Sequence, residues 1–120
     1  MEKKKYIEVF GTIDFMTQTQ QNTIDSIVKQ IIANYKPEKI ILFGSAATGD
    51  MGPDSDIDVV VIKNTHERFY DRMSTVRGAI QANGPLDILV YTPQEYAILT
   101  DESWFVGEEI AKKGKTVYAV

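Results

Sequence analysis

Hydrophobic residues along the chain recur at two spacings, one typical of helices and the other typical of strands. Between residues 17 and 35, Ile24, Ile27 and Ile31 lie three or four positions apart and predict a helix that ends before Pro37. Short apolar runs predict strands at residues 39–43, 56–63, 85–91 and 115–120.

The polar stretch after the second predicted strand returns to helical spacing. Residues 64–84 are predicted as a helix that begins with a capping box at Asn64 and Glu67 and ends at Gly84. The inner stripe of this helix would consist of Phe69, Met73, Val76 and Ile80.

Two further helices are predicted after the third strand, at residues 92–99 and 101–114. We expect Trp104 and Phe105 to pack the last helix onto the sheet. An exposed, partner-binding pair of aromatic residues is the alternative. The small residues of 45–50 favour a brief helix or a turn.

Strands that alternate with helices indicate an α/β (α+β) domain, with a mixed sheet of four to five strands flanked by helices. This domain would comprise residues 19–120. Residues 1–18 form a predicted N-terminal extension, in which residues 6–15 favour a strand or short hairpin. The order of the strands cannot be read from the spacing.

Composition narrows the classes of function. The chain has 120 residues and a formal net charge of −4, which argues against extended nucleic-acid binding but not against binding one nucleotide. It contains no cysteine, so thiolate metal sites and disulfides are excluded. No apolar stretch has the length of a signal peptide or a membrane span, so we expect a cytoplasmic protein without a membrane partner.

The candidate chemistry begins with Asp56 and Asp58 at the start of the second apolar strand. Side chains two positions apart on a strand project from the same face, whereas Ile57 and Val59 would face the core. Two adjacent carboxylates repel each other and are costly to desolvate. We therefore expect them to be metal ligands and catalytic residues, with Mg²⁺ as the cation.

Gly44 and Ser45 would supply the phosphate half of the same site. A glycine after a strand lets a phosphate approach the backbone, and a hydroxyl and free N–H groups follow it. Asp87, a charged residue inside the third apolar strand, would join the two aspartates if the strands are neighbours. Three carboxylates can hold two ions, and Asp87 would then help to deprotonate the acceptor hydroxyl.

The segment FGSAATGDMGPDSDIDVVVI, with LDILVY further on, resembles the minimal nucleotidyltransferases of the DNA polymerase β-like superfamily. Their signature is Gly-Ser, ten residues, Asp-x-Asp and a later third aspartate, and Gly44, Ser45, Asp56, Asp58 and Asp87 occupy these places. The resemblance implies a nucleotidyltransferase fold, Mg²⁺, and transfer of a nucleoside monophosphate from a triphosphate, expected to be ATP, to a hydroxyl group.

The resemblance also implies a partner. Many minimal members act with a helical HEPN-type protein, as antitoxins that transfer AMP to a tyrosine of that protein. Because the sequence ends soon after its last predicted strand, we expect another molecule to supply much of the acceptor side. Homo-oligomerisation stays open.

One feature departs from the family pattern. Family members often carry arginines just after the serine, in the sequence Gly-Ser-Arg-Ala-Arg-Gly, where this chain has Ala46, Ala47, Thr48 and Gly49. Their role would be absent or moved to Lys63, Arg68 or Arg72. A second hypothesis is therefore an antitoxin-like binding module with weak or no catalysis, which neutralises a helical partner by forming a complex. A metal-bound nucleotide sensor is a third, weaker idea.

Overall fold

The computed structural model of the chain describes residues 5–6, 17–82 and 84–120. Beyond Tyr6, the hairpin predicted over residues 6–15 lies outside these residues. The helices and strands follow in the order β1 (Lys5–Tyr6), α1 (Gln18–Tyr35), β2 (Lys39–Phe43), α2 (Ser45–Thr48), β3 (Ile57–Ile62), α3 (Phe69–Gly78), β4 (Leu86–Tyr91), α4 (Pro93–Glu102), η1 (Phe105–Lys112) and β5 (Lys115–Ala119). No helix in the described ranges is long and apolar enough to cross a membrane.

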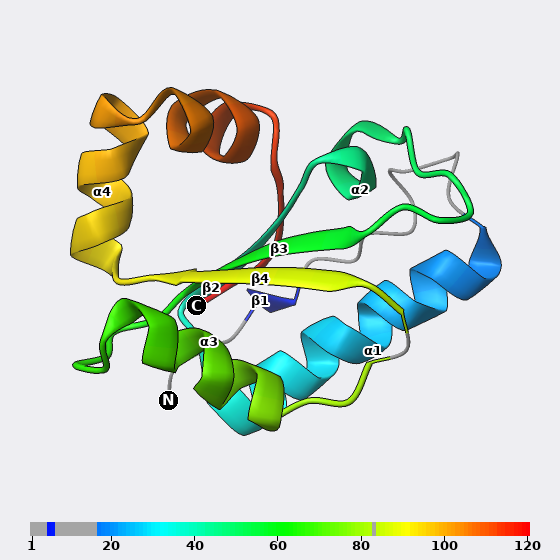
Figure 1. Cartoon of the computed structure of the whole chain (residues 1–120), viewed down its shortest axis with the longest axis horizontal. Coiled ribbons are helices and arrows are strands. Elements are labelled where there is room, and N and C mark those ends of the chain that lie inside the picture. The colour runs from blue at the N-terminus through cyan, green and yellow to red at the C-terminus, as the bar shows by residue number, and fades with distance from the viewer. Residues whose placement is uncertain (1–4, 7–16, 83) are drawn as a thin grey trace.

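The strands form one mixed sheet in the order β1-β5-β2-β3-β4. The pair β3 and β4 is parallel, and the other neighbouring strands are antiparallel. Helices α1 and α3 cover one face of the sheet, whereas α4 and η1 lie over the other (Figure 1). The predicted mixed sheet flanked by helices is therefore confirmed.

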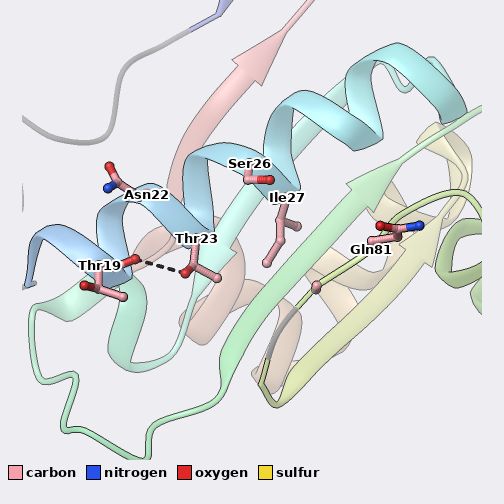
Figure 2. A pocket seen from close by; sticks show the side chains of 7 residues that line it. Thr19, Asn22, Thr23, Ser26, Ile27 and Gln81 are labelled. Atoms are coloured by element: carbon pink, nitrogen blue, oxygen red, sulfur yellow. Dashed lines mark hydrogen bonds between the residues drawn. The ribbon is translucent and has the colours of Figure 1, made fainter.

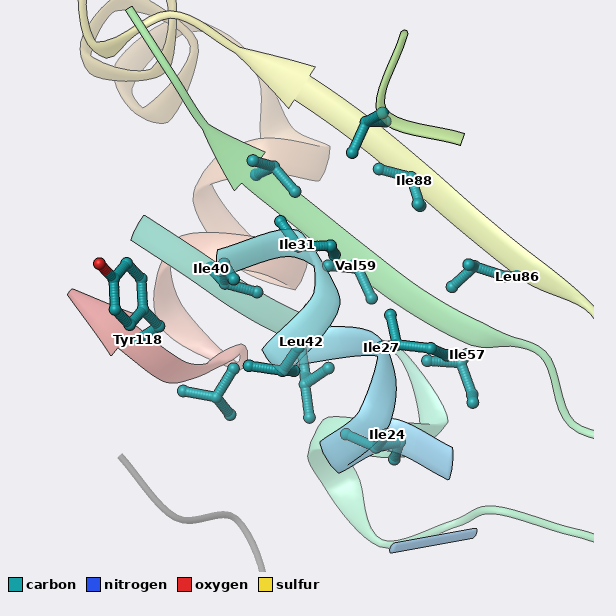
Figure 3. Packing of buried hydrophobic residues seen from close by; sticks show 14 of the residues in the cluster. Ile24, Ile27, Ile31, Ile40, Leu42, Ile57, Val59, Leu86, Ile88 and Tyr118 are labelled. Atoms are coloured by element: carbon teal, nitrogen blue, oxygen red, sulfur yellow. The ribbon is translucent and has the colours of Figure 1, made fainter. Parts of the chain in front are cut away.

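The larger core lies between α1 and the sheet. Ile24, Ile27 and Ile31 of α1 are almost fully buried and belong to the same cluster as Val59 of β3 and Ile88 of β4 (Figure 3). The helix begins at a capping box in which Thr17 and Gln20 exchange hydrogen bonds. The predicted helix is confirmed, because its isoleucine stripe is the surface that the sheet covers.

A second core lies on the opposite face, between the sheet and the last two helices. Val60 and Ile62 of β3 are buried there beside Val106 and Ile110 of η1. These valine and isoleucine residues of β3 share a face with Asp58, since they lie two and four positions after it. The expected burial of Ile57 and Val59 in a core is confirmed on the opposite face, and β3 is thus buried on both faces beyond Asp58.

The helix predicted over residues 64–84 is shorter than expected. It begins at Phe69 and ends at Gly78, so the capping box at Asn64 and Glu67 is wrong. The amide of Glu67 donates to Thr65 Oγ1, and the carboxylate of Glu67 accepts a hydrogen bond from Thr75. These local bonds satisfy the polar residues of the loop without a helical turn.

The last helix has π rather than α geometry. It packs tightly on α4, because a Cβ added to Gly107 would lie 2.7 Å from the carbonyl oxygen of Thr100. Trp104 is 71% exposed and Phe105 is 41% exposed. The expected packing of Trp104 on the sheet is wrong, and Phe105 is only partly covered, by Phe43.

Candidate active site

Two carboxylates meet on neighbouring strands near α2. Asp58 on β3 and Asp87 on β4 are direct register partners in the parallel pair, so both side chains project from the same face. Asp87 is close enough to Asp58 to raise the pKa of the Asp58 carboxyl group. The sequence predicted a shared site only if the strands of these two aspartates are neighbours, and β3 and β4 are neighbours in the sheet.

The environment of Asp58 disfavours its charge. Partial burial is the main cause, and the neighbouring carboxylates of Asp87 and Asp56 add to it; together they raise the pKa of Asp58 to about 6. Among the residues that the structure describes, no basic group is a cause of this shift. A cation is the species that would relieve it, because it favours the ionised carboxylate.

Asp56 lies one position before β3 and is exposed, whereas Asp58 is half-buried. The negative charge of Asp56 contributes to the raised pKa of Asp58. In the ranges that the structure describes, no three acidic or histidine side chains form a group able to hold a metal ion. The structure thus brings Asp58 and Asp87 together, with Asp56 at the margin. The metal-binding and catalytic roles of all three stay predictions.

Gly44 brings the backbone against the carboxylate pair. Its φ of 65° and ψ of −145° are accessible in practice only to glycine, and a Cβ placed here would collide with the Asp58 carboxylate. Its carbonyl accepts hydrogen bonds from the amides of Ala47 and Thr48, which starts the single turn of α2 at Ser45. Gly44 and Ser45 therefore lie beside Asp58, as the sequence predicted.

The alanines after Ser45 hold α2 in place. Ala46 is fully buried and Ala47 is nearly so, and Ala46 belongs to the larger core. A long cationic side chain at Ala46 would have no space in this packing. At Ala46 the departure from the family pattern is therefore part of the core packing, whereas Thr48 is exposed and sets no such limit.

The proposed substitutes for the missing arginines act elsewhere. Lys63 follows the far end of β3 and donates hydrogen bonds to the carbonyls of Tyr35 and Lys36. Arg72 is buried on α3 and pairs with Glu95 at the start of α4. Arg68 is the exposed residue before α3. Each of these three residues lies at or beyond the end of the strands that is far from Asp58.

The donor atoms present suit a hard divalent cation. Mg²⁺ is usually held by one or two carboxylates, waters and the phosphates of its substrate rather than by a complete protein cage. Asp58 and Asp87 supply such a carboxylate pair, and the missing side chain of Gly44 lets the Asp58 carboxylate lie directly against the backbone. The site therefore fits a magnesium ion that arrives with a triphosphate.

Phe43 is a neighbour of the site that the sequence did not reveal. It was predicted only as part of a buried strand, yet it lies directly opposite Asp58 on β2. Its ring makes an edge-to-face contact with Phe105, with ring centroids 5.7 Å apart. Only the register between strands shows this, and a single sequence does not give the register.

The fold and the site define an α+β domain with a carboxylate pair beside a glycine turn. The family model of the nucleotidyltransferase domain matches residues 24–118, and the chain belongs to this family. The resemblance read from the Gly-Ser and aspartate motif is thus confirmed. A search of curated proteins gives no match.

A solved structure shares the fold. It is described as "a putative nucleotidyltransferase from Sulfolobus solfataricus" and has 23% sequence identity to this chain. The match covers 79% of this chain and 76% of that chain, with a TM-score of 0.56. This likeness supports the nucleotidyltransferase fold, whereas the family assignment rests on the sequence match.

Proposed function

We propose that this protein is an Mg²⁺-dependent nucleotidyltransferase that transfers a nucleoside monophosphate, AMP from ATP, to a hydroxyl acceptor and releases pyrophosphate. The observation that carries the proposal is the paired carboxylates of Asp58 and Asp87 beside the glycine turn at Gly44. The family assignment supports the reaction class.

The position of each residue suggests its role in binding the triphosphate, holding the metal or accepting a proton. The backbone at Gly44 and the hydroxyl of Ser45 would bind and orient the triphosphate. Asp58 and Asp87 would hold the metal, with Asp56 as a third carboxylate beside them. A bound magnesium ion would supply charge neutralisation at the phosphates. Asp87, on the outermost strand β4, would take up the proton of the acceptor hydroxyl as general base.

A labelled-nucleotide assay tests the reaction. ATP labelled on the α-phosphate is incubated with the protein, Mg²⁺ and an acceptor protein, and we expect label on the acceptor. The variants Asp56→Ala/Asp58→Ala and Asp87→Ala should lose transfer by at least a hundredfold, while Asp71→Ala, an exposed carboxylate on α3, should not. Full transfer by the aspartate variants would refute the mechanism.

The acceptor is proposed to be a tyrosine of a helical HEPN-type protein, so that the chain would act as an antitoxin. The family resemblance suggests this partner. Exposed apolar side chains offer a docking surface, and Tyr70 and Ile98 are 81% and 55% exposed beside an apolar groove lined by Phe69 and Leu99. Co-purification with such a protein, followed by mass analysis of its tyrosines, tests the proposal.

The second candidate is a binding module that neutralises its partner without catalysis. The buried alanines at Ala46 and Ala47 and the marginal position of Asp56 favour it. On this hypothesis, Asp58→Ala and Asp87→Ala would neutralise the partner as well as the parent protein does. Calorimetry would then detect no binding of ATP in the presence of Mg²⁺.

A further inference from the structure

Two neighbouring aromatic side chains lie exposed at the start of η1. Trp104 is the only tryptophan of the chain, and it and Phe105 keep 71% and 41% of their surface open. Aromatic surface of this size usually packs in a core or binds a partner. We call the partly open ring of Phe105 the aromatic platform.

The aromatic platform adjoins the carboxylate pair through one residue. Phe105 contacts the ring of Phe43 edge to face, with ring planes at 85°, and Phe43 is the register partner of Asp58. Asp58 in turn is the register partner of Asp87. The four side chains therefore follow one another across the same face of the sheet, in the order Phe105, Phe43, Asp58, Asp87.

The fold holds Phe105 in this place. Phe43 is buried and cannot move away, and Val106, the next residue of η1, is 2% exposed in the core below. The close approach of Gly107 to Thr100 fixes η1 against α4. A ring that is rigidly supported and still partly open loses little conformational entropy when a planar ligand stacks on it.

We propose that the aromatic platform binds the nucleobase of the triphosphate by stacking. The proposal rests on the proposed nucleotidyltransferase function, because it takes the triphosphate to lie at Gly44 and Ser45. Gly44 directly follows Phe43 in the chain, so the expected phosphate site and the aromatic platform are contiguous on the β2 side of Asp58.

The same order of residues excludes the acceptor as the occupant. Asp87 lies on β4, the outer strand, and is the carboxylate farthest from Phe105 in this row. An acceptor hydroxyl that reaches Asp87 approaches from that edge, which leaves the β2 side to the base. The stacked pair of Phe69 and Tyr91 is a poorer candidate, because Tyr91 lies four residues, about 13 Å, along β4 from Asp87.

Calorimetry with two ligands tests the platform. In the presence of Mg²⁺, the parent protein should bind ATP more tightly than inorganic tripolyphosphate, which has no base. Phe105→Ala should weaken ATP binding roughly tenfold and leave tripolyphosphate binding unchanged. Phe105→Tyr keeps the aromatic ring and should bind ATP as tightly as the parent protein does. Val120→Ala removes an apolar side chain that is 47% exposed after β5, close to the 41% of Phe105, and should change neither affinity.

The outcomes separate this proposal from the proposed function. If the parent protein bound ATP and tripolyphosphate with equal affinity, or if Phe105→Ala left the ATP affinity unchanged, base stacking on the aromatic platform would be contradicted. Neither result would contradict the proposed phosphate site. An equal loss of both affinities in Phe105→Ala would also contradict base stacking on the aromatic platform, since that result indicates damage to the site. A parent protein that binds neither ligand would overturn the proposed function and the platform together.

Discussion

Asp58 on β3 and Asp87 on β4 lie directly opposite each other on the only parallel pair of neighbouring strands in the described sheet. Partial burial and the neighbouring carboxylates raise the pKa of Asp58. Ionising Asp58 in the metal-free protein therefore costs free energy of unfolding, which can be measured as a function of pH.

The first prediction is that Asp58→Asn stabilises the metal-free protein at neutral pH. The raised pKa of Asp58, about 6, means that the folded state binds more protons than the unfolded state between pH 3.8 and pH 6, so stability falls as pH rises through this window. Asparagine has nearly the same shape as aspartate and carries no charge at any of these pH values. Because Asp58 is half-exposed, we expect a gain of only about 1 kcal/mol at pH 7.5.

Thermal unfolding in EDTA at pH 3.5 and pH 7.5 measures the effect. The melting temperature of Asp58→Asn should exceed that of the parent protein by roughly 4 °C at pH 7.5 and match it at pH 3.5. Added Mg²⁺ and ATP should raise the melting temperature of the parent protein but not that of the variant. Equal melting temperatures at both pH values would show that Asp58 is not strained by its neighbours.

The second prediction concerns the glycine turn. Gly44→Ala should destabilise the protein by about 1–3 kcal/mol, because the residue has a positive φ and the new Cβ would collide with the Asp58 carboxylate. Displacing Asp58 should also abolish binding of ATP with Mg²⁺. Urea unfolding and calorimetry measure the two effects.

Gly78→Ala is the matched control for this substitution. Gly78 ends α3 without a positive φ, and a Cβ there would meet nothing within 4 Å. Alanine should therefore stabilise the helix by up to about 1 kcal/mol and leave nucleotide binding unchanged. If Gly44→Ala changed neither stability nor ATP binding more than Gly78→Ala does, the close approach of the backbone to Asp58 would not be needed for either.

The sequence predicted the strands because each is a short apolar run, and it predicted α1 because Ile24, Ile27 and Ile31 repeat at helical spacing. It also indicated Gly44, Ser45 and the aspartates, since a charge inside an apolar strand stands out. These signals are local. They require no knowledge of which strands are neighbours.

The features that the sequence did not reveal depend on long-range or subtle local geometry. The register that places Phe43 opposite Asp58 depends on pairing between strands. The π geometry of η1 differs from an α-helix only in the spacing of its hydrogen bonds, which leaves almost no trace in the pattern. The late start of α3 reflects the side chains of Thr65 and Glu67, which satisfy the loop without a helix.

The third prediction uses Lys36, the one described residue other than glycine with a positive φ. It follows α1 in the left-handed conformation, where its amide still donates to the carbonyl of Ile31. Lys36→Gly should stabilise the protein by about 0.5–1 kcal/mol, since glycine adopts this conformation without a steric cost.

Ala33→Gly, an exposed position inside α1, should have the opposite sign and cost about 1 kcal/mol. Urea unfolding compares the two variants directly. The bond from Lys63 to the Lys36 carbonyl uses the backbone and should survive the substitution. Destabilisation by both glycines would argue against the left-handed cap at Lys36.

The fourth prediction is an asymmetry in the ion pair of Arg72 and Glu95. The guanidinium bonds both carboxylate oxygens, at 2.6 and 3.1 Å, and its side chain is only 7% exposed, whereas that of Glu95 is 40% exposed. Glu95→Ala should cost about 3 kcal/mol, because it leaves a buried charge without its partner. Arg72→Met should cost about 1 kcal/mol, since the remaining carboxylate can be hydrated.

Acid unfolding gives an independent check on the same pair. The hydrogen bond from Arg72 is the main cause that lowers the pKa of Glu95, so the contribution of the pair is present above about pH 4.5 and lost as pH falls through the folded-state pKa. Arg72→Met should therefore flatten the dependence of unfolding free energy on pH below 4.5. Lys112→Ala, which breaks an exposed pair with Glu108, should change stability by less than about 0.5 kcal/mol. An equal cost for Glu95→Ala and Arg72→Met would show that burial of the guanidinium does not set the energetics of this contact.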